Sequence, residues 1–104
     1  FVSVTEPSQF QGGDLNKFNA WVAQNIKYPQ LAVENGISGK VYVQFAVNSK
    51  GNLVDAKVLR GVDAALDQEA IRVIQSSPKW TAPKQNGRPV KQLFTLPVTF
   101  KLQE

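Results

Sequence analysis

The sequence predicts an α+β domain in which two main helices cover one face of a small antiparallel sheet. Three observations support this: two amphipathic helical stretches, a β-hairpin and a long alternating final segment share 104 residues. Helices that flank a hairpin and a last strand are typical of the α+β class. No internal repeat and no low-complexity stretch divides the chain, so residues 1–104 are interpreted as one domain.

Residues 1–13 form a lead-in segment. Phe1 to Thr5 alternate between apolar and polar residues, which indicates an edge strand, before Pro7 and the glycines at positions 12 and 13 introduce a turn.

The first helix is expected next, because Asp14 is a favourable N-cap and apolar residues follow at spacings of three and four, namely Leu15, Phe18, Val22 and Ile26. Pro29 should end this helix near Lys27, and a short helical turn, QLAVEN, should then stop at Gly36.

A β-hairpin is the clearest local pattern. Residues 40–47 place Val41, Val43, Phe45 and Val47 on one face of a half-buried strand. Turn residues 48–52 follow, and a second strand is expected in which Val54, Ala56 and Val58 alternate with Asp55 and Lys57.

The second main helix and the last strand complete the chain. Asp63 can cap the helix, whose apolar stripe of Leu66, Ala70, Val73 and Ile74 ends before Pro78. From Leu93 to Gln103, the residues Phe94, Leu96, Val98, Phe100 and Leu102 alternate with Thr95, Pro97, Thr99 and Lys101. This segment is predicted to be a long strand.

The topology follows from the order of these elements. A strand reached through one crossover helix runs parallel to the strand before that helix, so in an antiparallel sheet it cannot be its neighbour. The predicted spatial order is therefore second, first, last, with the apolar first strand in the centre and a right-handed crossover. Pro97 agrees with an edge position for the last strand, because proline cannot donate to a ladder.

Composition excludes several classes of function. The chain has no cysteine and no histidine, which removes disulfides, thiolate nucleophiles and the commonest metal ligand and general base. We therefore expect no enzyme activity, no catalytic residue, no cofactor, no metal and no small-molecule substrate. The formal charge of +4 is spread over single lysines and arginines, which favours a solvated surface over nucleic-acid binding. The chain starts at Phe1 and has no apolar run long enough to span a bilayer, so we expect it to be part of a longer or processed protein.

Several motifs occur together in a fixed order. They are KYPQLAVENGISGKVYVQFAVNSKGNLVDAKVLRGVD, LDQEAIRVIQSSPKW and FTLPVTFKL, preceded by QFQGGD. Their combination resembles the TonB C-terminal domain family, in the variety found in the Bacteroidota, over nearly the whole chain. The loop WTAPKQNG departs from the proline and glycine pattern expected there.

The resemblance implies a periplasmic domain of an inner-membrane-anchored protein. Such a domain binds the TonB-box segment of outer-membrane transporters and transmits force from an inner-membrane motor complex, which it reaches through a region upstream of this chain. Partner contacts are expected at Lys27, Tyr28 and Pro29, and along the free edge of the last strand at Thr95, Pro97, Thr99 and Lys101. The oligomeric state is left open, with a weak dimer as one option.

Plainer interpretations apply to other residues. Trp21 and Trp80 are expected to pack in or near the core, Asp63, Asp67 and Glu69 to serve the helix terminus rather than a metal, and Asn86-Gly87 to form a turn. Three alternative functions remain: a hydrolase using serine with lysine or paired carboxylates, a nucleic-acid binder with aromatic residues on its sheet, and an interaction domain of a membrane-anchored sensor or secretion protein.

Overall fold

A computed structural model describes residues 5–102 of the chain. In chain order its elements are α1 (Leu15–Asn25), α2 (Gln30–Glu34), β1 (Gly39–Val47), β2 (Leu53–Arg60), α3 (Ala64–Gln75), β3 (Lys84–Gln85), β4 (Arg88–Pro89) and β5 (Gln92–Phe100). Both main helices begin where their caps were predicted. Asp14 accepts a hydrogen bond from the N–H of Asn16, and Asp63 accepts one from Ala65.

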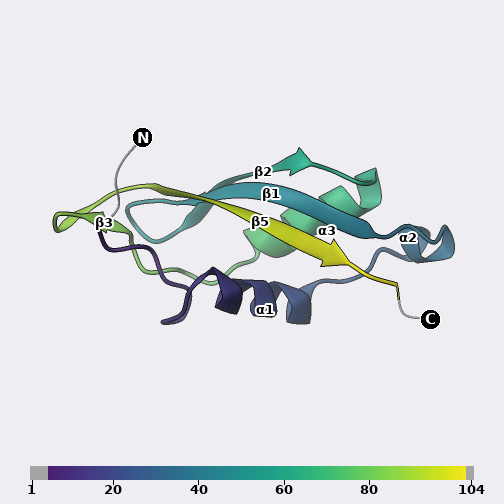
Figure 1. The fold of residues 1–104 in the computed structure, drawn as a ribbon, viewed down its shortest axis with the longest axis horizontal. Helices are drawn as coiled ribbons and strands as arrows, with labels where there is room; N and C mark the ends of the chain where they lie inside the picture. The colour runs from purple at the N-terminus through teal and green to yellow at the C-terminus, as the bar shows by residue number, and fades with distance from the viewer. Residues whose placement is uncertain (1–4, 103–104) are drawn as a thin grey trace.

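The main sheet has the predicted order β2-β1-β5, with both pairings antiparallel (Figure 1). The central strand β1 is also the most buried one, because Val41, Val43, Phe45 and Val47 are inaccessible to solvent. The two outer strands run parallel to each other on either side of it. The α+β class and the strand order predicted from the sequence are therefore confirmed.

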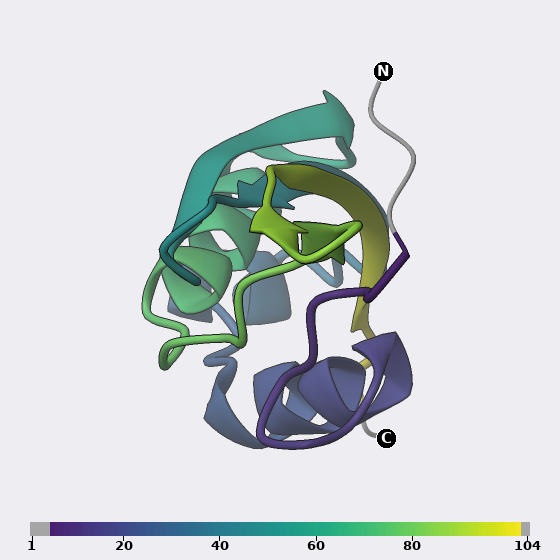
Figure 2. The same ribbon diagram turned by 90° about the vertical axis from the view of Figure 1, so that its left-hand side faces the viewer.

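The two long helices lie on the same face of the sheet. The end-on view shows the sheet curling over them, with α3 beneath β1 and β2 and α1 beneath β5 (Figure 2). Phe18 and Val22 of α1 and the predicted stripe of α3 point into the core between these layers. Among residues 5–102 we find no helix long and apolar enough to cross a lipid bilayer.

The strand β2 is irregular, which corrects the predicted alternation. Gln44 pairs with Lys57 but Ala46 pairs with Val54, so one extra residue is inserted in β2, at the place where Asp55 has a positive φ of 57°. A bulge of this kind reverses the alternation of side chains beyond it. As a result Leu53, rather than Val54, packs against the core together with Ala56 and Val58.

The lead-in segment is more structured than expected. Residues 1–4, most of the predicted edge strand, lie outside the described residues, and from residue 5 onward the lead-in follows the loop before β5. Glu6 forms a bridge with Lys84, the Ser8 hydroxyl donates to Thr81 O at 2.5 Å, and Thr81 N–H donates to Gln9 O at 2.9 Å. This course buries Phe10 completely.

An aromatic cluster fills one end of the core. Phe10, Phe18, Phe45, Trp80 and Phe94 form one connected group of rings, in which the centroids lie 4.9 Å apart for Phe10–Phe18 and 5.8 Å apart for Phe45–Trp80. Trp80 is only 4% exposed, and Trp21 stacks on Phe18 at 5.7 Å. The expected packing of both tryptophans is confirmed.

Candidate functional site

The outer edge of β5 is unpaired in the part of the chain that the structure describes. The sheet ends at β5, and neither of the isolated bridges reaches it. Its inner edge pairs with β1 over nine consecutive residues without a register shift, and Pro97 lies opposite Tyr42. In an antiparallel ladder, hydrogen-bonded and non-hydrogen-bonded pairs alternate, so a proline in a regular ladder belongs to a non-hydrogen-bonded pair.

This parity determines which backbone groups face outward. If Pro97 and Tyr42 form a non-hydrogen-bonded pair, then so do Thr95 with Gln44 and Thr99 with Lys40. The N–H and C=O groups of Thr95 and Thr99, and the C=O of Pro97, then point to the free edge. Three of the four residues expected at this edge, Thr95, Pro97 and Thr99, are therefore alternate residues of β5 whose backbone groups face outward.

Lys101 differs from that expectation. The last strand was predicted to reach Gln103, but β5 ends at Phe100, which leaves Lys101 exposed one residue beyond it. Gln103 is outside the described residues. The backbone of Lys101 thus does not extend the regular ladder, although its side chain remains beside the strand end.

A groove at the end of β5 brings together three of the residues expected to contact a partner. Tyr28, Thr99 and Lys101 line it, and its other lining residues are Ala23, Ile26, Val33, Phe100 and Leu102, around a volume of about 670 Å³. The Tyr28 ring packs edge-to-face on Phe100 at 5.6 Å, and its hydroxyl donates to Ile37 O. Tyr28 is therefore held firmly with part of its ring at the groove.

Lys27 and Pro29 do not line this groove. The backbone N–H of Lys27 donates to Glu69 Oε2 at 2.6 Å, and Pro29 occupies the N-cap position of α2. Both residues therefore fix the course of the chain on either side of Tyr28. These positions give both residues a structural role, and their contact with a partner stays a prediction.

An ion pair on α3 holds the segment from Asn25 to Lys27 in place. Arg72 donates to both carboxylate oxygens of Glu69, at 2.6 and 2.7 Å, and its Nη2 lies 3.4 Å from Asn25 O at the end of α1. The hydrogen bonds from Arg72 are the main reason that the pKa of Glu69 lies below its ordinary value, and the Lys27 N–H adds to the effect, whereas burial opposes it. The Glu69 side chain is only 10% exposed.

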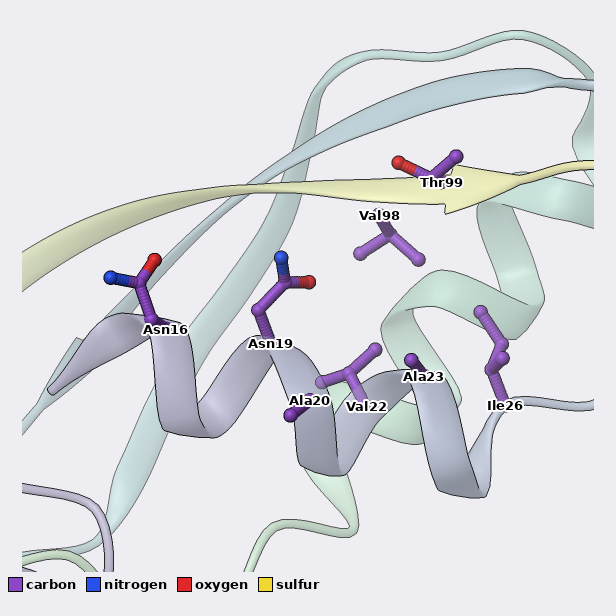
Figure 3. Close-up of a pocket in the computed structure, with 8 residues that line it drawn as sticks. All are labelled: Asn16, Asn19, Ala20, Val22, Ala23, Ile26, Val98 and Thr99. Carbon is purple, nitrogen blue, oxygen red and sulfur yellow. The ribbon is translucent and has the colours of Figure 1, made fainter. Parts of the chain in front are cut away.

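A second groove separates α1 from β5, and it was not among the features predicted from the sequence. It is lined by Asn16, Asn19, Ala20, Val22, Ala23, Ile26, Val98 and Thr99, with a volume of about 330 Å³. Figure 3 shows the side chains of Asn16, Asn19 and Ile26 directed toward β5, while Val98 points down toward α1. The sequence does show that the predicted helix has no charged residue at these positions. Helical periodicity alone, however, does not show which strand lies opposite them.

The remaining candidates have structural roles. Asp63 caps α3 and Asp67 accepts from the Val62 N–H at 3.1 Å, and no group of three or more metal-binding side chains occurs among residues 5–102. Asn86 and Gly87 form the tight turn between β3 and β4, with φ of 51° and 80°. The aromatic side chains of Phe45 and Phe94 face the helices, which does not favour base stacking on the sheet.

Comparison with protein families gives one match that covers most of the chain. The family model described as "Gram-negative bacterial TonB protein C-terminal" matches residues 24–102. The protein TonB of Vibrio cholerae serotype O1 is 31% identical over 78 residues, which is 74% of this chain and 32% of that protein. The protein TonB of Helicobacter pylori strain J99 is 31% identical over 64 residues, 61% of this chain and 23% of that protein. The chain thus spans a third or less of these relatives.

Solved structures agree with the family match. The NMR solution structure of residues 194–285 of the H. pylori TonB C-terminal domain superposes with a TM-score of 0.64 at 27% identity, covering 86% of this chain and 95% of that one. A longer version, residues 179–285, gives a TM-score of 0.69 at 25% identity, covering 86% of this chain and 81% of that one.

Proposed function

Because the chain belongs to the family of Gram-negative bacterial TonB C-terminal domains, we propose that it is the partner-binding module of a TonB-type energy transducer. The proposed ligand is the TonB-box segment of an outer-membrane transporter, which adds as a strand to the free edge of β5. The role is binding and force transmission rather than catalysis. The rest of such a protein would supply the inner-membrane anchor and the connection to the motor complex, and place this domain in the periplasm.

The observation that supports this most directly is the combination of an unpaired β5 edge with Pro97. An extended peptide can pair with an open edge through its backbone, and side-chain pockets beside the edge then provide specificity. Pro97 removes one outward donor, which limits pairing between the edges of two free copies. The opposite edge of the sheet, β2, carries the Asp55 bulge and is therefore less suited to accept a regular strand.

Affinity should be moderate. Each added backbone hydrogen bond contributes roughly 0.5 to 1.5 kcal/mol net, and the peptide loses conformational freedom when it becomes ordered. A micromolar or weaker Kd is expected. Under tension along the strand direction, however, the backbone bonds of the added strand are loaded together, so a pair of modest affinity can carry force while it persists.

The test removes a second outward N–H from β5. In Thr99→Pro the inward ladder should remain, because Thr99 has the same parity as Pro97. Binding of a synthetic TonB-box peptide is followed by NMR titration of the ¹⁵N-labelled domain. We expect the wild type to show shifts at the Thr95 and Thr99 amides, and Thr99→Pro to bind at least about tenfold more weakly, a difference of ~1.4 kcal/mol.

Thr99→Val is the matched control. It removes the hydroxyl but keeps the backbone N–H, so it should bind the peptide like the wild type. If Thr99→Pro keeps a dispersed native spectrum and binds with unchanged affinity, strand addition at this edge is wrong.

A further inference from the structure

The wall of α1 that faces β5 is uncharged. Asn16, Asn19, Ala20 and Ala23 are all exposed, and their spacing of three, four and seven residues places them on one face of the helix. Figure 3 shows this face along the edge of β5. In a chain where charged residues make up 19% of the sequence, the groove is lined only by amides, a hydroxyl and small or branched apolar side chains.

The two asparagines in this wall are not engaged by the domain itself. Asn25 and Asn35 also lie on exposed helical turns, and each donates its side-chain amide to the carbonyl four residues earlier, at 2.8 and 2.9 Å. Within residues 5–102, the side-chain amides of Asn16 and Asn19 make no such bond to protein, and they point toward β5 (Figure 3). They therefore offer donors and acceptors to an occupant of the groove.

The neighbouring backbone determines the kind of occupant. The outward N–H and C=O groups of β5 require an extended peptide, and a strand that pairs with β5 must alternate its side chains between the two faces of the sheet. Residues on the same face as Val98 would point toward α1, as Val98 does in Figure 3. The residues between them would point away into solvent.

Resting on the strand addition proposed above, we infer that α1 and β5 together select the peptide through the side chains at alternate positions. These positions take uncharged side chains: a hydroxyl or amide near Asn16 and Asn19, and a small or branched apolar group near Ala23 and Ile26. The two grooves share Ala23, Ile26 and Thr99, so the apolar end continues toward Tyr28, Phe100 and Leu102. A positively charged side chain facing α1 would lose hydration without gaining a partner of opposite charge, because no carboxylate lines either groove.

Most of the residues proposed to select the peptide belong to α1. The family model begins its match at residue 24, so nearly all of α1 (Leu15–Asn25) lies outside it. The strand edge belongs to the matched region, whereas most of the α1 wall lies outside it.

The first experiment fills the groove without changing the strand edge. Ala23→Trp places a bulky ring in the groove, and Gln24→Trp, at an exposed α1 position outside the groove lining, is the matched control. With the same TonB-box peptide, we expect Ala23→Trp to weaken binding at least about tenfold and Gln24→Trp to leave it within about twofold. Shifts of the Thr95 and Thr99 amides report strand addition in each case.

The outcomes separate the two proposals. If Ala23→Trp binds like the wild type while the β5 amides still shift, groove selection is wrong and strand addition stands. If the peptide never shifts the β5 amides of the wild type, strand addition is wrong and the inference falls with it.

The second experiment places one lysine at each peptide position in turn. The wild type should lose affinity about tenfold or more at alternate positions only, and Ala23→Glu should restore binding for one of these lysine peptides. Tolerance of lysine at every position, or no rescue by Ala23→Glu, would overturn the inference. The rescue cannot arise from a general loss of stability, since it requires the variant to bind better.

Discussion

The backbones of Gly51 and Trp80 are in direct contact. The Trp80 N–H donates to Gly51 O at 2.8 Å, and a Cβ added to Gly51 would lie only 2.2 Å from Trp80 O. Gly51 also has a φ of +82°, a conformation that side chains disfavour. The hairpin turn therefore accepts only glycine here, for two independent reasons, and this contact seats Trp80 over the aromatic core.

Gly51→Ala and Gly87→Ala separate these two reasons. Gly87 has a similar φ of +80°, but nothing lies within 4 Å of its added Cβ. Gly87→Ala should cost about 1 to 2 kcal/mol of unfolding free energy from backbone strain alone. Gly51→Ala should cost about 1 to 3 kcal/mol more because of the clash. Equal losses in urea denaturation would contradict the close contact.

Phe45→Ala should be among the most damaging single substitutions. Phe45 is fully buried on the central strand and contacts Phe18, Trp80 and Phe94. Its removal should lower the free energy of unfolding by about 3 to 5 kcal/mol. Phe94→Ala is the comparison, since Phe94 pairs with Phe45 across the ladder but is only partly buried, and it should lose less. The reverse order in equilibrium denaturation would show that the packing is assigned incorrectly.

The lead-in segment should behave as part of the folded core. Phe10 has 0% exposure although it lies outside the family match, so Phe10→Ala should also cost about 3 to 5 kcal/mol. Gln9→Ala is the control, because Gln9 is exposed and its bonds to Thr81 use only its backbone. If Phe10→Ala melts at the same temperature as Gln9→Ala, the lead-in does not stabilise the domain.

Glu69 should make stability depend on pH on the acid side. Its pKa is lowered in the folded protein, so its ionised form stabilises the fold. This contribution is complete above the ordinary value of 4.5 and is lost as pH falls through the lower folded value. Glu69→Gln should therefore be less stable than the wild type at neutral pH. The difference between their free energies of unfolding should shrink as the pH falls through the lowered pKa of Glu69.

Glu34→Gln provides the control for this measurement. The Glu34 carboxylate is exposed and accepts from the neutral Gln30 side chain at 3.4 Å. At neutral pH we expect its substitution to lower the free energy of unfolding less than Glu69→Gln does, because Glu34 accepts only from a neutral amide at 3.4 Å among the described residues. A Glu69→Gln curve that runs parallel to the wild type from pH 7 to about pH 3 would contradict the role of Glu69.

Local sequence patterns were sufficient to predict most helices and strands and the order of the strands in the sheet. Asp14 and Asp63 marked the helix starts, Pro29 and Pro78 followed the helix ends, and the alternation in β1 and β5 showed which side chains face the core. Each of these features depends on neighbours within a few residues or on a rigid proline ring. The strand order followed from connectivity together with Pro97.

Only the tertiary structure determined which residues far apart in the sequence are in contact. Phe10 is flanked by polar residues and belongs to no periodic apolar pattern, and it is buried because the chain returns to residues 81–84. The Asp55 bulge reverses the alternation of β2 through pairing with β1, which strand propensity does not encode. The groove beside β5 exists because α1 packs under a strand more than 65 residues away in sequence, and helical periodicity shows which face of α1 is exposed without showing what that face meets.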